Sequence, residues 1–466
     1  MADATLVQQL AAFAAHARFD ALPSIVANSA PRRVLDVVGL ALAALELDTS
    51  QAVLTWVAAQ GGSPQATVVG GPHAPASAAA FANGVLAHSL DYDDTHLPSV
   101  LHPSASVVPA ALATAELAGA SGPQLLTAVA VGIEVCVRLG MAGYDRESGQ
   151  SLFFERGQHA TSICGAVGSA AAAALLLGLD EDGLAHAMGL SVSMGSGVLE
   201  ANRNGGSVKR LHCGWAAHAG VMAAELAQLG FTAPPTVLEG RFGFFEAWLS
   251  GRYEPAEITL GLGKDWALPG LHDKPYPANH FTHASIDAAL RLRDKGIRPA
   301  DVASVELAVP NATVRTIGEP LDAKRRPPSG YTAKFSGPFV FAAALHGGGG
   351  LGVGLDDFTD ALTVDPSYQA LMDRTTVVGS AQCDALYPQV LPCVVTVTLH
   401  DGRTVVEEVL VNRGGPDLPL TGDELMTKFL TNATRAVSDD VARRLATDLS
   451  RLPELPLAAT ALEALR

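Results

Sequence analysis

The chain has few charged residues and few aromatic ones. Of its 466 residues, 17% are Asp, Glu, Lys or Arg and 6% are aromatic, whereas 48% are hydrophobic. The charge that is present is mainly negative, and the formal net charge is −16. A surface of this sign repels polyanions, which argues against binding to nucleic acid or to an anionic membrane. The length favours two or three domains, and the hydrophobic fraction is sufficient for a large core.

Cysteine is also scarce, and its spacing is irregular. The five cysteines form no CxxC pair, and an odd, scattered set is typical of a reducing compartment. The N-terminal segment lacks the basic start and apolar stretch of a secretory signal. The most apolar long run, 163–179, is rich in Ala and Gly and is followed by three acidic residues, which favours a buried helix over a membrane span. We therefore expect a cytoplasmic protein with no membrane partner.

The first half of the chain is alanine-rich and has helical periodicity. Residues 32–47, 106–119 and 162–178 are apolar on nearly every face, which is typical of helices at the centre of a bundle. Their small side chains allow helices to approach closely. We expect this part of the protein to be compact and almost entirely α-helical.

The pattern changes after Lys264. Three segments alternate like strands: 302–309, 394–399 and 405–411. Asp401-Gly402, between the last two, predicts a type I′ hairpin turn. Three further segments have helical periodicity: 283–294, 339–345 and 365–373. Beyond the hairpin, Thr421 and Glu424 have the spacing of a capping box at the start of a helix.

This order predicts a mainly α-helical protein with an inserted domain. We expect a large all-helical bundle domain over 1–264, a smaller α/β lid domain over 265–411, and C-terminal helices over 412–466 that return to the bundle. The glycine-rich segment 346–354 follows a helix and lacks a GK[ST] ending. It therefore predicts a helix-to-helix connection rather than a phosphate loop.

Titratable residues are concentrated in the segment 88–102, HSLDYDDTHLPSVLH. Carboxylates beside imidazoles can separate proton affinities, as general acid–base catalysis requires. The same groups can also bind a divalent metal, in a cage of Asp91, Asp93, Asp94 and His96. Because carboxylates this close repel one another, some of them must be hydrogen-bonded or protonated.

A second basic group precedes a small-residue helix that we expect at 214–229. It consists of Lys209, Arg210 and His212. A lysine beside a helix N-terminus is a natural binding site for a carboxylate. A solvated basic turn is the alternative, and composition alone does not decide between them.

Five segments of the chain form a pattern through their order and spacing. They are HSLDYDDTH with HPS at 88–104, GQHATSICGAVGSAAAAALLLGL at 157–179, SVKRLHCGWAAHAGVMAAELAQLGF at 207–231, KPYPANHFTHASIDAAL at 274–290 and TAKFSGPFVFAAAL at 332–345. The pattern resembles the MmgE/PrpD family over essentially the whole chain. Members of that family include dehydratases, decarboxylases and an epimerase of small carboxylic acids. The resemblance implies a helical domain joined to an α/β lid, an active site between them, no metal or organic cofactor, and a homodimer.

The resemblance also implies a set of site residues. The expected catalytic residues are Asp91, His102, His159 and Lys209, and the expected substrate-binding residues are Thr95, Lys274, Asn279 and His280. His102 and His159 are the acid–base candidates, and Asp91 would orient an imidazole or raise its basicity. Lys209 and Lys274 would hold substrate carboxylates.

Two positions depart from the decarboxylase branch of the family. The lid histidine of that branch aligns with Asn279, next to His280, and its tyrosine aligns with Phe339, which cannot donate a proton. The spacing from Thr95 to His102 is also one residue longer. These departures argue against decarboxylation of cis-aconitate. Outside this set, His283 and Asp287 are one helical turn apart and are expected to form a pair on the lid surface.

We therefore expect a cofactor-independent lyase of the dehydratase type that acts on a small di- or tricarboxylic acid by general acid–base catalysis. Proton removal and return would instead give an epimerase or isomerase of a dicarboxylate, and a cis-aconitate type of decarboxylase is a further alternative. A non-catalytic carboxylate-binding scaffold is disfavoured, because it would need neither Lys209 nor His159. The expected partners are the carboxylate substrate and a second copy of the chain.

Overall fold

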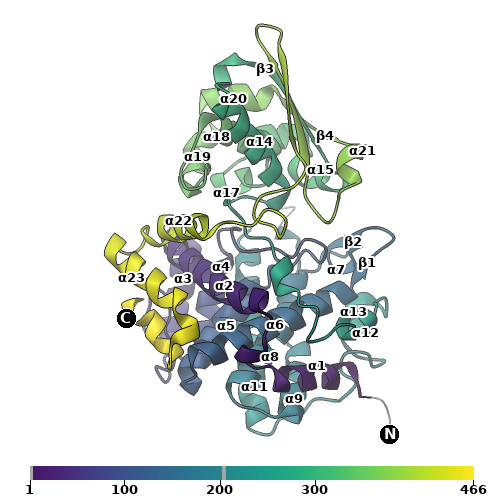
Figure 1. The fold of residues 1–466 in the computed structure, drawn as a ribbon, viewed down its shortest axis with the longest axis vertical. Coiled ribbons are helices and arrows are strands. Elements are labelled where there is room, and N and C mark those ends of the chain that lie inside the picture. Colours follow the sequence, from purple (N-terminus) through teal and green to yellow (C-terminus); the bar gives the residue numbers. More distant parts are fainter. Residues whose placement is uncertain (1–3, 202–205, 466) are drawn as a thin grey trace. The chain divides into compact units, whose positions relative to one another are not determined.

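The computed structural model describes residues 4–201 and 206–465, and the chain divides into two compact units. The helical unit comprises Met1–Leu271 and Phe429–Arg466, and the α/β unit comprises His272–Lys428 (Figure 1). The chain thus leaves the helical unit once and later returns to it. Both boundaries of the α/β unit lie further along the chain than the 265 and 411 expected from the sequence.

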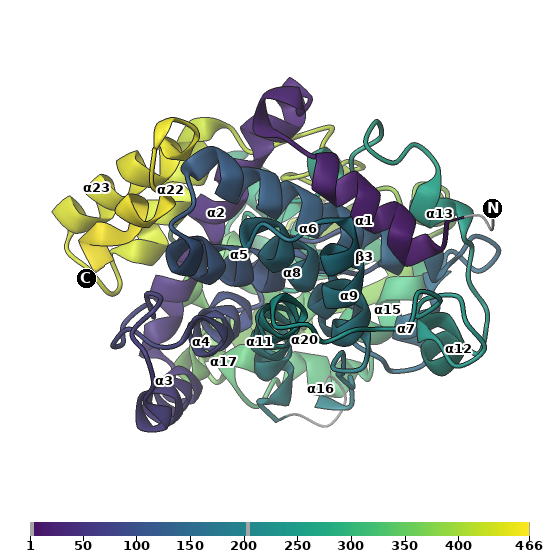
Figure 2. The ribbon, with the colours of Figure 1, turned by 90° about the horizontal axis from the view of Figure 1, so that it is seen from below.

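The core of the helical unit is built around α8 (Ala160–Leu176), in which residues 160–174 are all buried. Seen from below, α8 lies among the helices of the bundle core (Figure 2). Those helices are α4 (Ala76–His88), α5 (Ser104–Ala118), α6 (Gly122–Ala142), α9 (Glu181–Val192) and α11 (Val208–Gln228). Alanine and glycine dominate α8 because its neighbours approach it on every side. The predicted mainly α-helical architecture is confirmed.

Other helices surround this core. They are α1 (Leu6–His16), α2 (Ser24–Ala43), α3 (Asp48–Gln60), α7 (Leu152–Glu155), α12 (Phe244–Leu249), α13 (Ala256–Thr259) and α23 (Asp439–Ser450), and α22 (Gly422–Ala433) crosses the second boundary between the units. The helical unit is almost entirely helical, as the sequence predicts, although not strictly all-helical: Tyr144–Asp145 and Gln150–Ser151 pair as the short antiparallel strands β1 and β2. Alanine periodicity does not extend into this segment.

Two buried residues of α6 explain why the helical unit extends to Leu271. Arg138 donates hydrogen bonds to the carbonyls of Ile258, Leu260 and Asp265, at 2.8–3.1 Å. Glu134 binds Arg138 on one oxygen and accepts the amide of Ala267 on the other, at 2.7 Å. These bonds satisfy a chain segment that has little secondary structure of its own.

Helix α6 is long and apolar enough to cross a membrane, but 94% of its most apolar stretch is buried inside the protein. The helical segments Ser24–Glu46 and Asp48–Gln60, which meet at a bend, are long and apolar enough for a membrane span only when they are taken together. Core helices of folded proteins meet the same criteria. The run 163–179, which the sequence predicts to be a buried helix, falls mainly within α8 and is buried up to Ala174.

The start of α11 differs from the sequence-based prediction in a way that matters for the site. The helix begins at Val208 rather than at residue 214, so Lys209 lies in its first turn and is 8% exposed. The sequence pattern did not predict this first turn, because the basic residues at 209–212 interrupt the small-residue pattern of the rest of the helix. Gly205, which precedes this basic group, lies outside the described residues.

Helices α4 and α11 pack directly against each other through glycines. A Cβ atom at Gly84 would lie 2.8 Å from the Cα of Gly214, and one at Gly214 would lie 2.5 Å from the carbonyl oxygen of Phe81. No side chain larger than hydrogen fits at either position. This close approach brings the C-terminal end of α4 beside the first turns of α11.

The α/β unit contains a four-stranded sheet in the order β4-β3-β5-β6. The strands are β3 (Val302–Val309), β4 (Thr375–Gly379), β5 (Cys393–Leu399) and β6 (Thr404–Val409); β4 is parallel to β3, and the other pairs are antiparallel. The sequence predicted β3, β5 and β6 but missed β4, which is short and lacks a regular alternation of buried residues.

Helices cover the apolar face of this sheet. Helices α14 (His283–Asp294) and α18 (Gly337–His346) pack on each other and against the strands, and α20 (Pro366–Asp373) packs on α18 (Figure 1). All three were predicted. The short helices of this unit are α15 (Asn311–Ile317), α16 (Leu321–Arg325), α17 (Gly330–Ala333), α19 (Asp360–Thr363) and α21 (Ala381–Asp384).

The connecting segments confirm two predictions and correct a third. The Thr421 amide donates to the Glu424 carboxylate at 2.7 Å, and the Glu424 amide donates to the Thr421 hydroxyl at 3.2 Å, which completes the capping box. The glycine-rich segment joins α18 to the next helical turn, as predicted. The β5–β6 hairpin has no type I′ turn, because among the residues of this loop only Gly402 has a positive φ. The loop is longer and closes where the Leu399 amide donates to the carbonyl of Arg403 at 2.8 Å.

We predict that Gly214→Ala destabilises the protein by roughly 1–3 kcal/mol, because overpacking forces α4 and α11 apart. Thermal unfolding should show a lowered midpoint. Gly270→Ala is the matched control, since a Cβ there meets nothing within 4 Å. An unchanged midpoint for Gly214→Ala would show that the two helices do not need this close contact.

Candidate active site

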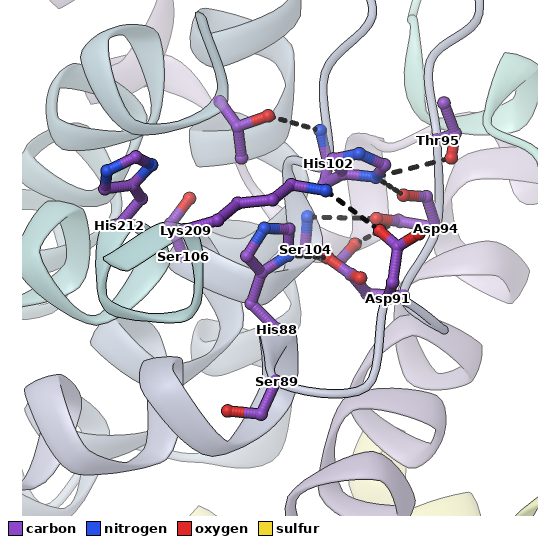
Figure 3. A network of polar contacts seen from close by, with 12 residues as sticks. His88, Ser89, Asp91, Asp94, Thr95, His102, Ser104, Ser106, Lys209 and His212 are labelled. Carbon is purple, nitrogen blue, oxygen red and sulfur yellow. Dashed lines mark hydrogen bonds and ion pairs between the residues drawn. The ribbon is translucent and has the colours of Figure 1, made fainter. Parts of the chain in front are cut away.

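A buried polar cluster lies in the helical unit where α4 ends and the first turns of α8 and α11 begin (Figure 3). The loop that follows α4 contributes its carboxylates, and α11 contributes Lys209 and His212. Burial removes these groups from water and strengthens the interactions between them. Each charge therefore needs a neighbouring opposite charge, and each polar atom needs a hydrogen-bond partner within the protein.

Asp91 and Lys209 form an ion pair across the cluster. The Lys209 Nζ atom donates to Asp91 Oδ1 at 3.1 Å, and both side chains are buried (Figure 3). Asp91 has a φ of 54°, a left-handed conformation that aspartate tolerates better than most residues do. Lys209 is therefore not in a solvated basic turn, and in this structure a carboxylate of the same chain contacts its ammonium group.

The next two aspartates each have a basic partner of their own. Asp93 accepts from His88 Nδ1 at 2.8 Å, and Asp94 lies 3.6 Å from Arg33 of α2. Asp94 also accepts from the Ser104 hydroxyl and amide. Burial raises the pKa of Asp94 to about 6, even though Arg33 and Ser104 act in the opposite direction. The predicted need for hydrogen bonds among these carboxylates is thus met.

His102 has a defined orientation. Its Nδ1 atom lies 2.7 Å from the carbonyl oxygen of Asp94 and 3.3 Å from Thr95 Oγ1 (Figure 3). A carbonyl oxygen can only accept, so Nδ1 carries the hydrogen and Nε2 is the basic nitrogen of the neutral ring. The backbone amide of His102 donates to Thr161 Oγ1 at 3.1 Å, which holds the ring at the start of α8. His102 can therefore exchange a proton through Nε2.

His159 occupies the N-cap position of α8 and pairs with His212 of α11. The two Nδ1 atoms lie 2.8 Å apart. Burial, first of all, lowers the pKa of His159 well below its usual value, and the nearby His88 and Lys209 add to this reduction. Burial likewise lowers the pKa of His212 to about 4. Both rings are therefore neutral at pH 7.

The predicted catalytic and binding residues do not include His88, and His212 enters the sequence analysis only as a member of the basic group at the start of α11. The ring of His88 lies 5.3 Å from that of His102 and 5.6 Å from that of His159, centroid to centroid, and no described residue bonds to its buried Nε2. No motif in the sequence distinguishes His88 from a core histidine. Its spacing to Asp93 was the one available signal, but this spacing alone does not reveal a hydrogen bond.

Only one group among the described residues has the geometry of a metal-ligand set. It consists of His88, Asp93 and Cys213, whose candidate ligand atoms lie within 4.8 Å of one another. It shares only Asp93 with the cage considered from the sequence. His96 of that cage bonds instead to Ser99 Oγ at 2.7 Å. Burial raises the pKa of the Cys213 thiol well above its usual value, which disfavours the thiolate that a metal would need.

The other predicted residues belong to the α/β unit. Lys274 is buried there, with 1% of its surface exposed. Asn279 uses its carboxamide oxygen to accept the amide of Phe281 at 3.1 Å, and it therefore caps a short helical turn. His280 is buried and lies 3.4 Å, at Nε2, from the side-chain amide of Asn412. The carboxamide of Asn279, held in this way, does not transfer a proton as the histidine of the decarboxylase branch would.

Two further residues of the α/β unit differ from the predicted picture. His283 and Asp287 do not form a surface pair, because both are buried and bond elsewhere. His283 Nε2 lies 3.1 Å from the carbonyl of Ala278, and Asp287 accepts from the Tyr276 hydroxyl at 2.6 Å. The one-turn spacing predicted proximity but could not show that this face of α14 points into the core.

The comparisons with known proteins agree over both units. The model of the MmgE/PrpD N-terminal domain matches residues 8–256, and that of the C-terminal domain matches residues 276–451. Human cis-aconitate decarboxylase is 30% identical over 453 residues, which cover 92% of this chain and 88% of the human one. A cis-aconitate decarboxylase-like protein of Aspergillus oryzae is 28% identical, covering 79% and 78%, and the cis-aconitate decarboxylase of Aspergillus terreus is 26% identical, covering 76% and 74%. This chain belongs to the MmgE/PrpD family.

Proposed function

We propose that this protein is a lyase that acts on a small tricarboxylic acid by general acid–base catalysis, without a metal or organic cofactor. The observation that carries the proposal is the buried cluster in which Lys209 lies among imidazoles whose proton states are set by their partners. Curated relatives that act on cis-aconitate support a tricarboxylate as the substrate class. A homodimer in the cytoplasm remains the expected form of the enzyme.

The residues of the cluster have distinct proposed roles. His102 exchanges a proton through Nε2, since Nδ1 is held by the carbonyl of Asp94. His159 is the second acid–base group. Lys209 attracts a substrate carboxylate, which would compete with Asp91 for the ammonium group or join it. The predicted substrate-binding roles of Thr95, Lys274, Asn279 and His280 remain part of the proposal.

Loss of water is the first reaction that this arrangement supports. One base removes the proton beside a carboxylate, and one acid protonates the departing hydroxyl, so that two imidazoles of opposite protonation state suffice. The Lys209 ammonium group stabilises the negative charge that develops on the carboxylate. Proton removal and return, without loss of water, would give an epimerase from the same groups.

Decarboxylation is the second candidate, and the names of the relatives favour it. Loss of carbon dioxide leaves a carbanion, which needs a single proton from an acid. Two observations on this chain oppose a close copy of that chemistry. Asn279 caps a helical turn, and Phe339 is packed between Phe358 and Tyr368 in the core of the α/β unit.

We predict turnover of at least one tricarboxylic acid in a panel of cis-aconitate, citrate and 2-methylcitrate, in deuterated buffer, followed by NMR. An unsaturated product identifies loss of water, and carbon dioxide with a decarboxylated product identifies the second candidate. Deuterium uptake without either identifies an epimerase, for which dicarboxylates are added to the panel. If no carboxylate is changed, the proposed lyase activity is wrong.

We predict that Lys209→Met lowers kcat/KM by an amount equivalent to roughly 2–4 kcal/mol of transition-state stabilisation, because one charged partner is lost from a desolvated site. Unlike a solvated lysine, Lys209 also neutralises buried Asp91, so its loss should reduce stability by roughly 3–5 kcal/mol. Kinetics and urea unfolding measure the two effects separately.

A double variant distinguishes the structural from the functional role of this pair. Lys209→Met with Asp91→Asn removes both charges, so stability should return while activity stays low. The exposed Lys264→Met is the matched control and should change stability by less than about 0.5 kcal/mol. Recovery of activity in the double variant would remove Lys209 from the proposed site.

We predict that prolonged treatment with EDTA leaves the activity unchanged. His88 and Asp93 already bond to each other, and burial keeps the Cys213 thiol protonated. Elemental analysis of the purified protein checks this prediction independently of the activity. A content of about one transition metal per chain, lost together with activity on chelation, would contradict it.

A further inference from the structure

His159 and His212 contact each other through the Nδ1 atom of each ring, which is unusual for a histidine pair. Their Nδ1 atoms are 2.8 Å apart, and both rings are buried. At this separation one hydrogen must lie between the nitrogens, because two bare nitrogens repel each other and two N–H groups collide. Bridging by a single hydrogen makes the protonation state of one ring depend on that of the other.

This coupling has a chemical consequence at the outer nitrogens. In the neutral pair, one ring has its hydrogen at Nδ1 and the other has it at Nε2. One Nε2 therefore accepts a proton while the other can donate one. The pair presents a base and an acid at its two ends, and it does so without a net charge.

We propose that His212 is the proton partner of His159, and that the two rings form a relay between their Nε2 atoms. A proton binds to the bare Nε2 of His159, and the bridging hydrogen moves from His159 Nδ1 to His212 Nδ1. His212 then releases the hydrogen from its own Nε2 to a water molecule. Each ring forms one N–H bond and breaks one, so the pair ends neutral with its tautomers exchanged. The proposal rests on the proposed function in taking the substrate as the source or recipient of the proton.

The surroundings favour passing a proton on over storing it. The titratable groups of the buried cluster come from α4, the loop after it and α11: His88, Asp91, Asp93, Asp94, His102, Lys209 and Cys213. Burial is the main cause of the lowered pKa values of both rings, and the nearby His88 and Lys209 lower them further. A pair with so low a proton affinity does not retain a second proton at neutral pH.

Backbone contacts hold the two rings in register. The His159 amide donates to the carbonyl of Gly197 at 3.0 Å, and the Ser162 hydroxyl donates to the carbonyl of His212 at 2.9 Å. A Cβ atom at Gly197 would lie 3.1 Å from the Cβ of His159 and 3.5 Å from His212 Nδ1. Gly197 therefore lets the backbone close over the bridging hydrogen bond.

The bridge itself can be tested without a substrate. In protein labelled with ¹⁵N at histidine, NMR should show one hydrogen-bonded proton coupled to two imidazole nitrogens. This signal should disappear in His212→Asn and persist in His218→Asn, a matched control on the same helix whose Nδ1 bonds to the carbonyl of Ser77. Absence of the coupled signal from the wild-type protein would overturn the proposal even if the enzyme is active.

The relay is tested by kinetics of His212→Asn. Asparagine keeps an acceptor near the position of Nδ1 but cannot pass a proton, so kcat should fall about 10- to 100-fold while KM stays within about twofold. Added imidazole should partly restore His212→Ala, which also serves if the asparagine variant folds poorly. Wild-type kcat in His212→Asn would show that the ring only positions His159, and would overturn the relay. An inactive wild-type protein would instead count against the proposed function, because the NMR result is independent of it.

Discussion

The site depends on the neutralisation of three carboxylates that the chain places within four residues. Asp91, Asp93 and Asp94 are buried, and charges of one sign this close cannot remain ionised without partners. The fold supplies a basic group to each from a different helix: Lys209 from α11, His88 from α4 and Arg33 from α2. At Asp94 the compensation is incomplete, since burial raises its pKa to about 6 in spite of Arg33. The proposed catalytic role and the structural role thus fall on the same charged groups, and a change at one of them is expected to affect both activity and stability.

The close packing of the bundle makes these charge pairs possible. Gly84 and Gly214 allow α4 and α11 to approach until their backbones touch, which brings the end of one helix beside the first turns of the other. The N-cap of α8 then adds His159 to the same cluster. Because a well-packed core resists displacement, the imidazoles are held before any ligand arrives, which is the condition for efficient proton transfer. The carbonyl of Asp94 and the ring of His212 play a similar part, because each restricts the proton on the histidine that it contacts.

Periodic and local features could be predicted from the sequence, and those that depend on tertiary contacts could not. Strand β3 and helix α14 have the predicted boundaries, and the Thr421 capping box forms, because each follows from residues close in sequence. The family resemblance led to Asp91, Thr95, His102, His159 and Lys209, which the structure gathers in one unit. His212, the ring partner of His159, is not in the predicted set, since a hydrogen bond between residues 53 apart leaves no local signal. His88 is not in it either, because a five-residue spacing to Asp93 does not by itself reveal their bond. Similarly, the turn at Asp401-Gly402 and the exposure of His283 depend on how neighbouring elements pack, which composition does not specify.

The central claim is that the cluster of the helical unit exchanges protons with a tricarboxylate held by Lys209. A crystal structure with a bound, unreactive tricarboxylate tests this claim most directly. The account predicts one ligand carboxylate within hydrogen-bonding distance of Lys209 Nζ and a ligand carbon or hydroxyl next to His102 Nε2 or His159 Nε2. A ligand bound away from this cluster, with the Lys209–Asp91 pair undisturbed, would contradict it.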